Sequence, residues 1–389
     1  MLHVILLFIA SQAHLEWKSI LQPILEHDDG KFLWYHPRAV AVSPTHRLIT
    51  LQKHLKVSDY YSGLYTMESG DAGKTWTKPE LQTALDWVKS EHGVTVAVAD
   101  VTPGWHAPTG KVIAVGAQVR YSPKGQQLED VPHSNQTAYA VYEPSTKQWS
   151  SWQIVPVPDH ADFNFARSAC SQWHVQPDGT VLLPFYHGTS ADKPYHVTVM
   201  SFSFDGHHLK LKQQGNRLSL PVVRGLCEPS IIFQQNAYYL TLRNDLRAYV
   251  STSKDGLHFS PINPWLFDDG TELGSYNTQQ HWVQSPENLY LVYTRRGANN
   301  DHIIRNRAPL FIAKVDTKNL RVIKQSERIL IPERGGEMGN FGACTINAAE
   351  SWVTVSEGIW SDDARRRGAK GATFISRIEW PSEEVNKNK

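Results

Sequence analysis

The 389-residue chain is poor in cysteine, with only three, and none of them lies in a metal-binding or redox spacing. Cys170, Cys227 and Cys344 each stand alone in a mixed apolar stretch, so we expect small buried residues and no disulfide framework. The 18 histidines show no His-x-x-x-His spacing and there is no Cys-x-x-Cys motif. We therefore expect no structural zinc, no other metal and no cofactor.

The chain also lacks an excess of charge of one sign. The 39 basic and 38 acidic residues leave a formal net charge of +1. A nucleic-acid or anionic-membrane partner usually leaves a basic excess over the whole domain. Neither partner is expected here, and any preference for an anion must come from a local cluster.

No apolar run is long enough to cross a bilayer, which takes roughly 20 residues. The longest N-terminal run covers only residues 4–10 and is followed by Ser11-Gln12-Ala13, a small-x-small pattern that resembles a signal-peptidase site. We predict a signal peptide at 1–13, a secreted or periplasmic protein, and one domain over 14–389. The alternative is that the run is the first strand of the fold.

Helical periodicity is nearly absent. One segment, 78–93, has Pro79 near its start, apolar residues spaced for one face and Gly93 at its end, so it predicts a helix. Elsewhere short β-rich runs such as "KVIAVGAQVRY", "HVTVMSFSF" and "AYYLTLR" alternate with turn residues. This pattern is typical of an all-β fold.

An internal repeat predicts the architecture. "SGDAGKTW" (69–76), "SFDGHHL" (203–209) and "SKDGLHF" (253–259) share Ser, Asp and Gly at fixed offsets, and "YEPSTKQW" (142–149) and "AKVDTKNL" (313–320) look like decayed copies. An Asp that accepts backbone N–H groups beside a flexible Gly is suited to a hairpin turn. Units of 50–70 residues with four strands indicate propeller blades, and these turns predict a six-bladed β-propeller of four-stranded antiparallel blades.

"SGDAGKTW" resembles the Asp-box (BNR) motif of sialidases and their relatives, which are six-bladed propellers. Further positions of that family fall in order along the chain. "WYHPRAVAVSP" offers a first inner-strand arginine, the stretch before the first Asp box offers an acid, and "RGLCEPSIIFQQNAYYLTLRND" offers a Glu and an Arg. "IIRNRAPLFIAKV" and "SWVTVSEG" supply a late Arg and a last-blade Glu. The resemblance implies an acidic-sugar site built from Arg38, Asp59, Glu228, Arg243, Arg307 and Glu357, with Arg305 as the alternative to Arg307.

In this resemblance three arginines hold the carboxylate of the sugar, because guanidinium groups bind such anions bidentately. Asp59 is the expected general acid, and Glu357 is expected to orient Arg38. One position departs from the family: "MGNFGACTI" places Phe341 where sialidases carry a tyrosine nucleophile. A water activated by Glu228, or the hydroxyl of Tyr276, would then have to attack the sugar.

Other polar residues in apolar surroundings, among them Arg167 and His281, are further candidates for substrate binding. The alternative interpretation is that Glu228–Arg243 and Arg38–Glu357 are ion pairs with a purely structural role. Three functions stay open: an exo-glycosidase that removes a terminal acidic sugar such as sialic acid, a lyase acting on uronic-acid polysaccharides, and a glycan-binding propeller without activity. The expected partner is an acidic oligosaccharide or polysaccharide, and the expected state is a monomer.

Overall fold

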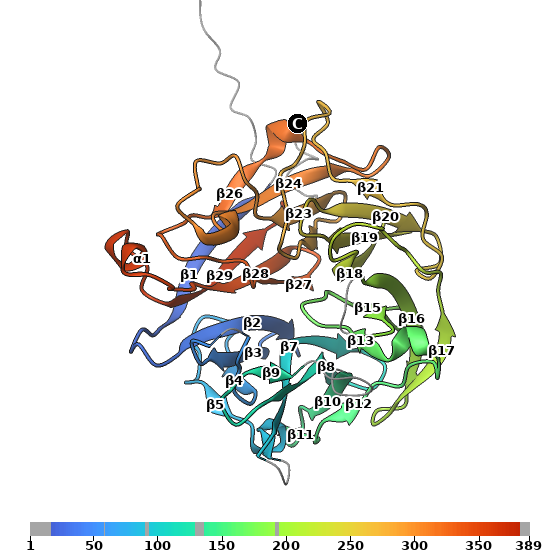
Figure 1. Ribbon diagram of the computed structural model, residues 1–389, viewed down its shortest axis with the longest axis vertical. Coiled ribbons are helices and arrows are strands. Elements are labelled where there is room, and N and C mark those ends of the chain that lie inside the picture. The colour runs from blue at the N-terminus through green and yellow to red at the C-terminus, as the bar shows by residue number, and fades with distance from the viewer. Residues whose placement is uncertain (1–16, 58, 90–92, 129–135, 191–193, 382–389) are drawn as a thin grey trace, which may run out of the picture.

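The computed structural model describes residues 17–57, 59–89, 93–128, 136–190 and 194–381, which form six antiparallel sheets set around a central axis (Figure 1). This arrangement confirms the predicted all-β propeller. The predicted signal peptide at 1–13 lies outside the described residues. Within the described part of the chain, no helix is long and apolar enough to cross a membrane.

The first three blades follow the chain from its inner to its outer strand. Blade 1 contains β2 (Leu33–Ala41), β3 (Arg47–His54), β4 (Tyr65–Ser69) and β5 (Glu80–Leu81). Blade 2 contains β7 (Thr95–His106), β8 (Lys111–Tyr121), β10 (Thr137–Glu143) and β11 (Gln148–Trp149), extended by β6 (Val88–Lys89), β9 (Gln127–Leu128) and β12 (Gln153–Ile154). Blade 3 contains β13 (Phe165–Arg167), β15 (Val181–Gly188), β16 (His196–Phe204) and β17 (Leu209–Gln214), with β14 (His174–Val175) also paired to β15.

The last three blades repeat this order. Blade 4 contains β18 (Cys227–Gln234), β19 (Ala237–Arg243), β20 (Tyr249–Ser253) and β21 (Asn263–Pro264). Blade 5 contains β22 (His281–Gln284), β23 (Leu289–Tyr293), β24 (Leu310–Asp316) and β25 (Arg321–Val322), with β26 (Arg328–Ile331) on β24. Blade 6 contains β27 (Gly342–Asn347), β28 (Glu350–Ser356), β29 (Ala372–Glu379) and β1 (Lys18–Glu26).

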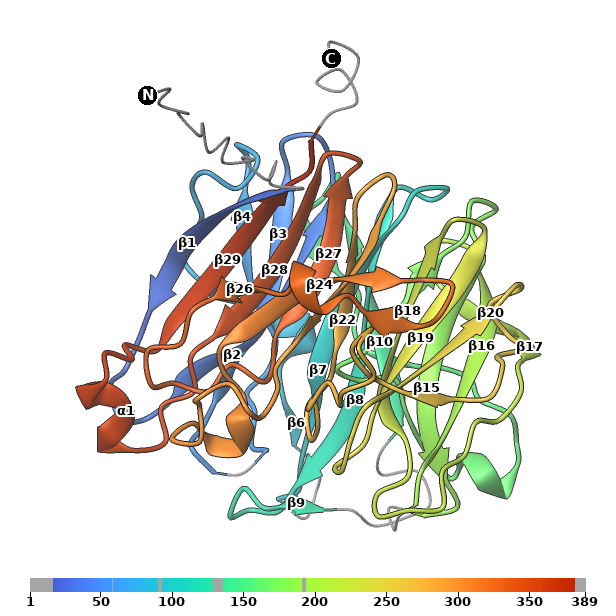
Figure 2. The same cartoon turned by 90° about the horizontal axis from the view of Figure 1, so that it is seen from above.

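The ring is closed by the two ends of the chain. The outer strand of blade 6 is β1, which pairs with β29 from Lys18 opposite Glu379 to Glu26 opposite Ala372. Figure 2 shows these two strands side by side. A sheet that contains both chain ends ties the first and last blades together, so the fold has no open edge between them.

The repeated acidic residues cap turns, as predicted. Asp71 accepts the N–H groups of Lys74 (3.0 Å) and Thr75 (2.9 Å), and Asp205, Asp255 and Asp316 each accept two backbone N–H groups in the same way. In the decayed copy of blade 2, Glu143 accepts the N–H of Ser145 (3.2 Å). These turns join the third and fourth strands of blades 1 to 5. Blade 6 has no such turn because its fourth strand comes from the other end of the chain.

The hydrophobic core lies in wedges between neighbouring blades. Trp352 of blade 6, fully buried, packs with Ile49 and Met67 of blade 1, and Trp282 of blade 5 packs with Trp265 after blade 4. Each wedge buries side chains from two sheets. The blades therefore hold their angular positions around the hub, and with them the residues at the starts of the inner strands.

The helix predicted for 78–93 is wrong. The described part of this segment contains β5, the 3-10 turn η1 (Thr83–Leu85) and β6. Leu85 is buried as predicted, but Val88 is exposed. The apolar spacing matched a helix by coincidence, because short edge strands of two blades occupy the segment. The remaining helical elements are also short: η2 (Ala161–Phe163), η3 (Ile304–Asn306), η4 (Lys324–Ser326) and α1 (Asp362–Arg366).

Candidate functional site

In each of blades 1 to 4, the edge of the sheet nearest the central axis carries one residue with left-handed backbone. These four residues lie at the same level along that axis. These are His36 (φ 53°), Asp100 (φ 56°), Cys170 (φ 51°) and Glu228 (φ 43°). In β2, β7 and β18 the residue interrupts the strand register, and in blade 3 it lies between β13 and β14. Residues other than glycine rarely adopt this conformation, which is concentrated at binding and active sites.

Three arginines gather around one of these residues. The charge of Glu228 acts on Arg38, Arg243 and Arg307, which come from blades 1, 4 and 5. Arg243 forms a short ion pair with Glu228. Asn277 connects two of the arginines, since its Oδ1 accepts from Arg243 (2.9 Å) and its carbonyl accepts from Arg307 (2.6 Å). The predicted convergence of these three arginines is therefore present.

The arginine cluster is buried but incompletely bonded. Arg38, Arg243 and Arg307 are 2%, 5% and 9% exposed. Among the described residues, Nε and Nη2 of Arg38, Nε of Arg243, Nε of Arg307 and Oε2 of Glu228 have no hydrogen-bond partner. Arg38 donates from Nη1 to the carbonyl of Asn340 at 3.3 Å. Buried polar groups are normally satisfied, so these atoms indicate space for a polar ligand.

Burial sets the electrostatics of the cluster. It lowers the pKa of Arg38 and of Arg307, and the carboxylates nearby offset this only in part. Burial also opposes the charge on Arg243, but the Glu228 carboxylate outweighs it and the pKa of Arg243 is raised. Two of the three guanidinium groups therefore carry a net desolvation cost, which a bound anion would relieve.

A tyrosine–carboxylate pair stands beside the arginines. The hydroxyl of Tyr35 in β2 donates to Oε1 of Glu337 at 2.5 Å, and Glu337 also lies 3.9 Å from Arg307. Burial, followed by the charge of Glu337, raises the pKa of Tyr35. Sequence reasoning missed this pair, although Tyr35 stands in the stretch that supplied Arg38. The pair joins blade 1 to the segment before blade 6, a contact that only the closed ring creates.

The role predicted for Glu357 is wrong. Both of its carboxylate oxygens bind Arg334, at 2.8 and 2.9 Å, and Oε2 also accepts the backbone N–H groups of Lys370 and Ala372. Arg38 is not its partner. Glu357 is buried directly after β28, and the sequence pattern did not identify Arg334 as the cation beside it.

Two predicted catalytic residues lie at the margin of the cluster. The Asp59 side chain is exposed, and its carbonyl accepts from the Tyr121 hydroxyl at 2.9 Å. The burial that the general-acid role requires is therefore absent in this structure. Tyr276 is half-buried, donates its hydroxyl to Asn306 at 2.8 Å and lies under the Arg296 guanidinium at 4.6 Å.

The remaining candidates are His281 and Arg167, and each contacts neighbouring residues. His281 is buried with both ring nitrogens in use, one to Ser230 (2.9 Å) and one to the carbonyl of Phe341 (3.0 Å), and burial lowers its pKa well below the usual range. Phe341 itself is fully buried in the core between blades 5 and 6. Arg167 is half-buried and lies over the Phe165 ring at 4.8 Å.

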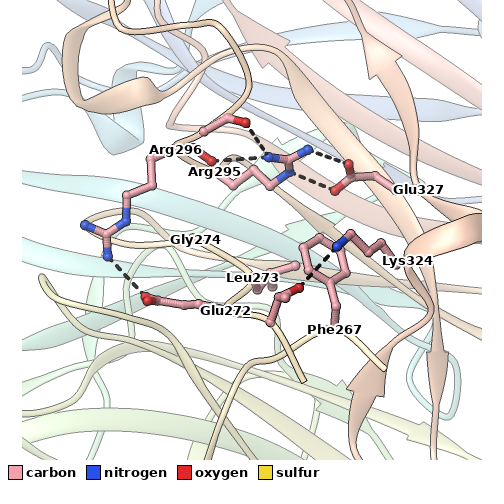
Figure 3. Close-up of a pocket in the computed structure, with 10 residues that line it drawn as sticks. Phe267, Glu272, Leu273, Gly274, Arg295, Arg296, Lys324 and Glu327 are labelled. Atoms are coloured by element: carbon pink, nitrogen blue, oxygen red, sulfur yellow. Dashed lines mark hydrogen bonds and ion pairs between the residues drawn. The ribbon is translucent and has the colours of Figure 1, made fainter. Parts of the chain in front are cut away.

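A cavity of about 430 Å³ lies away from the arginine cluster, between the segment after β21 and the segment after β23 (Figure 3). Its charged residues are paired with each other. Arg295 binds Glu327 through Nε (2.9 Å) and Nη2 (2.7 Å), and Arg296 lies 3.1 Å from Glu272. Because these charges already have partners, the cavity lacks the unsatisfied donors that mark the hub.

A second cavity, of about 350 Å³, occupies the other end of the hub. Its lining comes from the later halves of the inner strands and includes Thr102, Trp105, Phe233 and Gln284. No acidic or basic side chain other than the histidine His174 lines it. The two ends of the hub therefore differ in charge: the end with the arginine cluster is charged, and the end with this cavity is neutral.

No protein-family model and no curated protein matches the chain. Solved structures do. A Dyadobacter fermentans protein of unknown function aligns over 93% of this chain and 99% of its own, with a TM-score of 0.66 and 14% identity. The NanB sialidase of Streptococcus pneumoniae aligns over 92% of this chain and 70% of its own, with a TM-score of 0.63 and 12% identity.

Trypanosoma rangeli sialidase, solved in complex with sialic acid, aligns over 95% of this chain but 60% of its own, with a TM-score of 0.61 and 12% identity. The present chain therefore spans little more than half of that enzyme. At these identities the likeness establishes a sialidase-like propeller fold and not an activity.

Proposed function

We propose that the protein is an exo-glycosidase that holds the carboxylate of a terminal acidic sugar, sialic acid or a related acid, at the charged end of its hub. The observation that carries this proposal is the set of unpartnered, buried guanidinium nitrogens on Arg38, Arg243 and Arg307. Three buried cations that lie around one carboxylate and keep unpaired donors favour a ligand with a negative charge and several acceptor oxygens. The sialidase-like fold supports the choice of a sugar acid.

The proposed reaction is hydrolysis without a tyrosine in the family position. Oε1 of Glu228 is held by Arg243, while Oε2 has no partner within the described part of the chain. In this proposal Oε2 takes a proton from a water that attacks the anomeric carbon, and Asp59 donates a proton to the departing glycosidic oxygen. The exposed Asp59 loop has to fold over the sugar for that step, and a bound glycan would supply the burial.

A second candidate is an acidic-glycan-binding propeller without turnover. It is favoured by Phe341, which lies fully buried in the core and has no hydroxyl, and by the exposure of Asp59. The same arginine cluster would bind the sugar in both cases. The two proposals differ only in whether the glycosidic bond is broken.

The test is incubation of the purified protein with sialosides and with uronic-acid polysaccharides, followed by mass spectrometry of the products. Hydrolysis adds one water across the glycosidic bond and supports the first proposal. An unsaturated uronate indicates elimination and overturns it in favour of a lyase. Saturable binding of an acidic glycan without product supports the second candidate, and absence of both binding and product contradicts both.

A matched pair of variants locates the site. Arg243→Lys is expected to weaken binding of the acidic sugar strongly, because lysine cannot reproduce the bidentate geometry. Arg295→Lys makes the same change in another Arg–Glu pair, which is half-buried and lies in the cavity of Figure 3, and is expected to leave binding unchanged. Equal losses in both variants would indicate damage to the fold and not to a binding site.

A further inference from the structure

The hub contains a second cluster of reactive side chains, next to the arginines. One donor atom each from His36, Asp100 and Cys170 lies within 4.8 Å of the other two. The three residues come from the inner edges of blades 1, 2 and 3, which are far apart in sequence. We propose that His36, Asp100 and Cys170 form a binding site for a divalent transition-metal ion of the zinc class. This proposal does not depend on the glycosidase proposal.

The backbone is the first argument for this site. All three residues have left-handed φ values, 53°, 56° and 51°, and none of them is glycine. Each such residue costs on the order of 1–3 kcal/mol and persists only where the surrounding structure enforces it. Three blades thus adopt the same unfavourable conformation at one level, and its effect is to bring three side chains to one point.

The donor set is the second argument. A thiolate, an imidazole and a carboxylate are the ligands that zinc prefers, whereas a sulfur ligand disfavours magnesium and calcium. The carboxylate and the thiolate supply two negative charges, which match a divalent ion. Three protein ligands leave one of four tetrahedral positions open for water or another small ligand.

Access is the third argument. The His36 side chain is only 1% exposed and Cys170 is buried, but the side chain of Asp100 is 25% exposed. An ion can therefore reach the cluster past Asp100. A cluster sealed on all sides could be filled only during folding.

Metal binding would require a small movement of the ligand side chains. Nε2 of His36 lies 2.6 Å from Oδ1 of Asp100, without the alignment of a hydrogen bond. Two ligand atoms of a tetrahedral zinc ion are about 3.3 Å apart, given bonds of about 2.0 Å. The ion would therefore increase the distance between these two atoms by less than about 1 Å.

The charges around His36, Asp100 and Cys170 are compatible with a bound divalent ion. Cys170 and Asp100 both act electrostatically on Arg38, whose Nε and Nη2 have no hydrogen-bond partner among the described residues. Glu228 acts on the same guanidinium and partly offsets its charge. With an ion bound, Arg38 is placed to donate to the thiolate or carboxylate ligand, the kind of outer contact that orients metal ligands.

The test uses the whole reduced protein, stripped with a chelator and then titrated with Co²⁺. The expected result is one Co²⁺ per chain, with the visible bands of a tetrahedral site and a near-ultraviolet sulfur-to-cobalt charge-transfer band, both displaced by Zn²⁺. Cys170→Ser is expected to lose the charge-transfer band, and Asp100→Asn to weaken Co²⁺ binding at least tenfold. Neither readout requires enzymatic activity.

The other two cysteines provide matched controls. Cys227→Ser changes a fully buried thiol elsewhere in the hub, and Cys344→Ser changes a half-buried one, and both are expected to retain the band. Wild-type protein that shows no band with excess Co²⁺ overturns the proposal. So does a band that survives in Cys170→Ser. If Cys170→Ser does not fold, the wild-type titration and the two control variants still decide the question.

Discussion

The two ends of the hub are built from the same strands and have opposite character. In β2 the charged end holds His36 and Arg38, while the neutral end holds residues 39–41. In β18 Glu228 is followed three residues later by the apolar run 231–233. The four left-handed residues described above, His36, Asp100, Cys170 and Glu228, all lie at the charged end. The left-handed backbone therefore coincides with the change from a charged end to a neutral end.

Removal of one partner from the buried ion pair should have the largest effect on stability. Arg243→Met leaves Glu228 buried and unpaired, so we expect the free energy of unfolding to fall by about 3–5 kcal/mol. Denaturant titration measures the change. At the neutral end, Thr102→Val removes a hydroxyl whose oxygen has no partner in the described structure and should change stability by less than about 1 kcal/mol.

A double variant sharpens this test. Adding Glu228→Gln to Arg243→Met removes the orphaned charge and should recover part of the loss. If Arg243→Met costs no more than Thr102→Val, the ion pair is not desolvated and the contrast between the two ends fails.

Acid should destabilise both ends, because each contains a histidine with a lowered pKa: His54 is buried and His174 is half-buried. Burial lowers the pKa of His54, beside Tyr35, and of His174, at the neutral cavity, to about 4. The unfolded chain, with a histidine pKa near 6.5, binds more protons between pH 6.5 and 4. Stability is therefore full above pH 6.5 and falls towards pH 4, by at most about 3 kcal/mol for each histidine.

The measurement is denaturant unfolding at pH 7 and at pH 4.5. His174→Gln should reduce the loss of stability between these two values. His207→Gln, at an exposed position, should leave it unchanged. Identical pH dependence in wild type and His174→Gln would show that His174 is not buried in its neutral form.

A methyl group can displace an arginine without changing any charge. A Cβ on Gly342 would lie 2.5 Å from Cδ of Arg38, so Gly342→Ala should shift the guanidinium and weaken acidic-sugar binding about tenfold, or about 1.4 kcal/mol. At the neutral end, a Cβ on Gly104 would lie 2.5 Å from the Trp173 ring. Gly104→Ala should lower stability but not sugar affinity, as measured by calorimetric titration of the folded variants.

The smallest effect is expected at the cavity of Figure 3. Lys324 lines this cavity and binds Asp269 at 2.6 Å, and both side chains are exposed. Exposed ion pairs contribute at most about 1 kcal/mol, so Lys324→Ala should change the unfolding free energy by less than that. Sugar binding should be unaffected. A loss of binding in this variant would place the sugar in this cavity and not in the hub.

The fold could be predicted because its signals are local. Asp71, Asp205 and Asp255 each bind backbone groups within four residues, so the turn chemistry is visible in a short stretch of sequence. The five turns, with the closing strand, account for six blades. The helix predicted for 78–93 failed because apolar spacing over so few turns does not distinguish a helix from short edge strands.

The site could be predicted only in part. The arginines entered through resemblance to a family pattern, and the structure brings Arg38, Arg243 and Arg307 together around Glu228. Their partners were not predicted, because contacts between blades leave no spacing in the sequence. Asn277 bonds to both Arg243 and Arg307, which lie 34 and 30 residues away in the sequence. Glu357, whose carboxylate was assigned to Arg38, binds Arg334 instead. The same limit explains why ligand spacing gave no sign of the His36–Asp100–Cys170 cluster.

The most direct test of the account compares a sugar acid with its own methyl ester. N-acetylneuraminic acid and glucuronic acid, with their methyl esters, are titrated into the wild-type protein by calorimetry. Binding of at least one acid, and a loss of at least about 100-fold in affinity for its ester, is the predicted result. Equal affinity for acid and ester, or no binding of either acid, would contradict the claim that the buried arginines recognise a carboxylate.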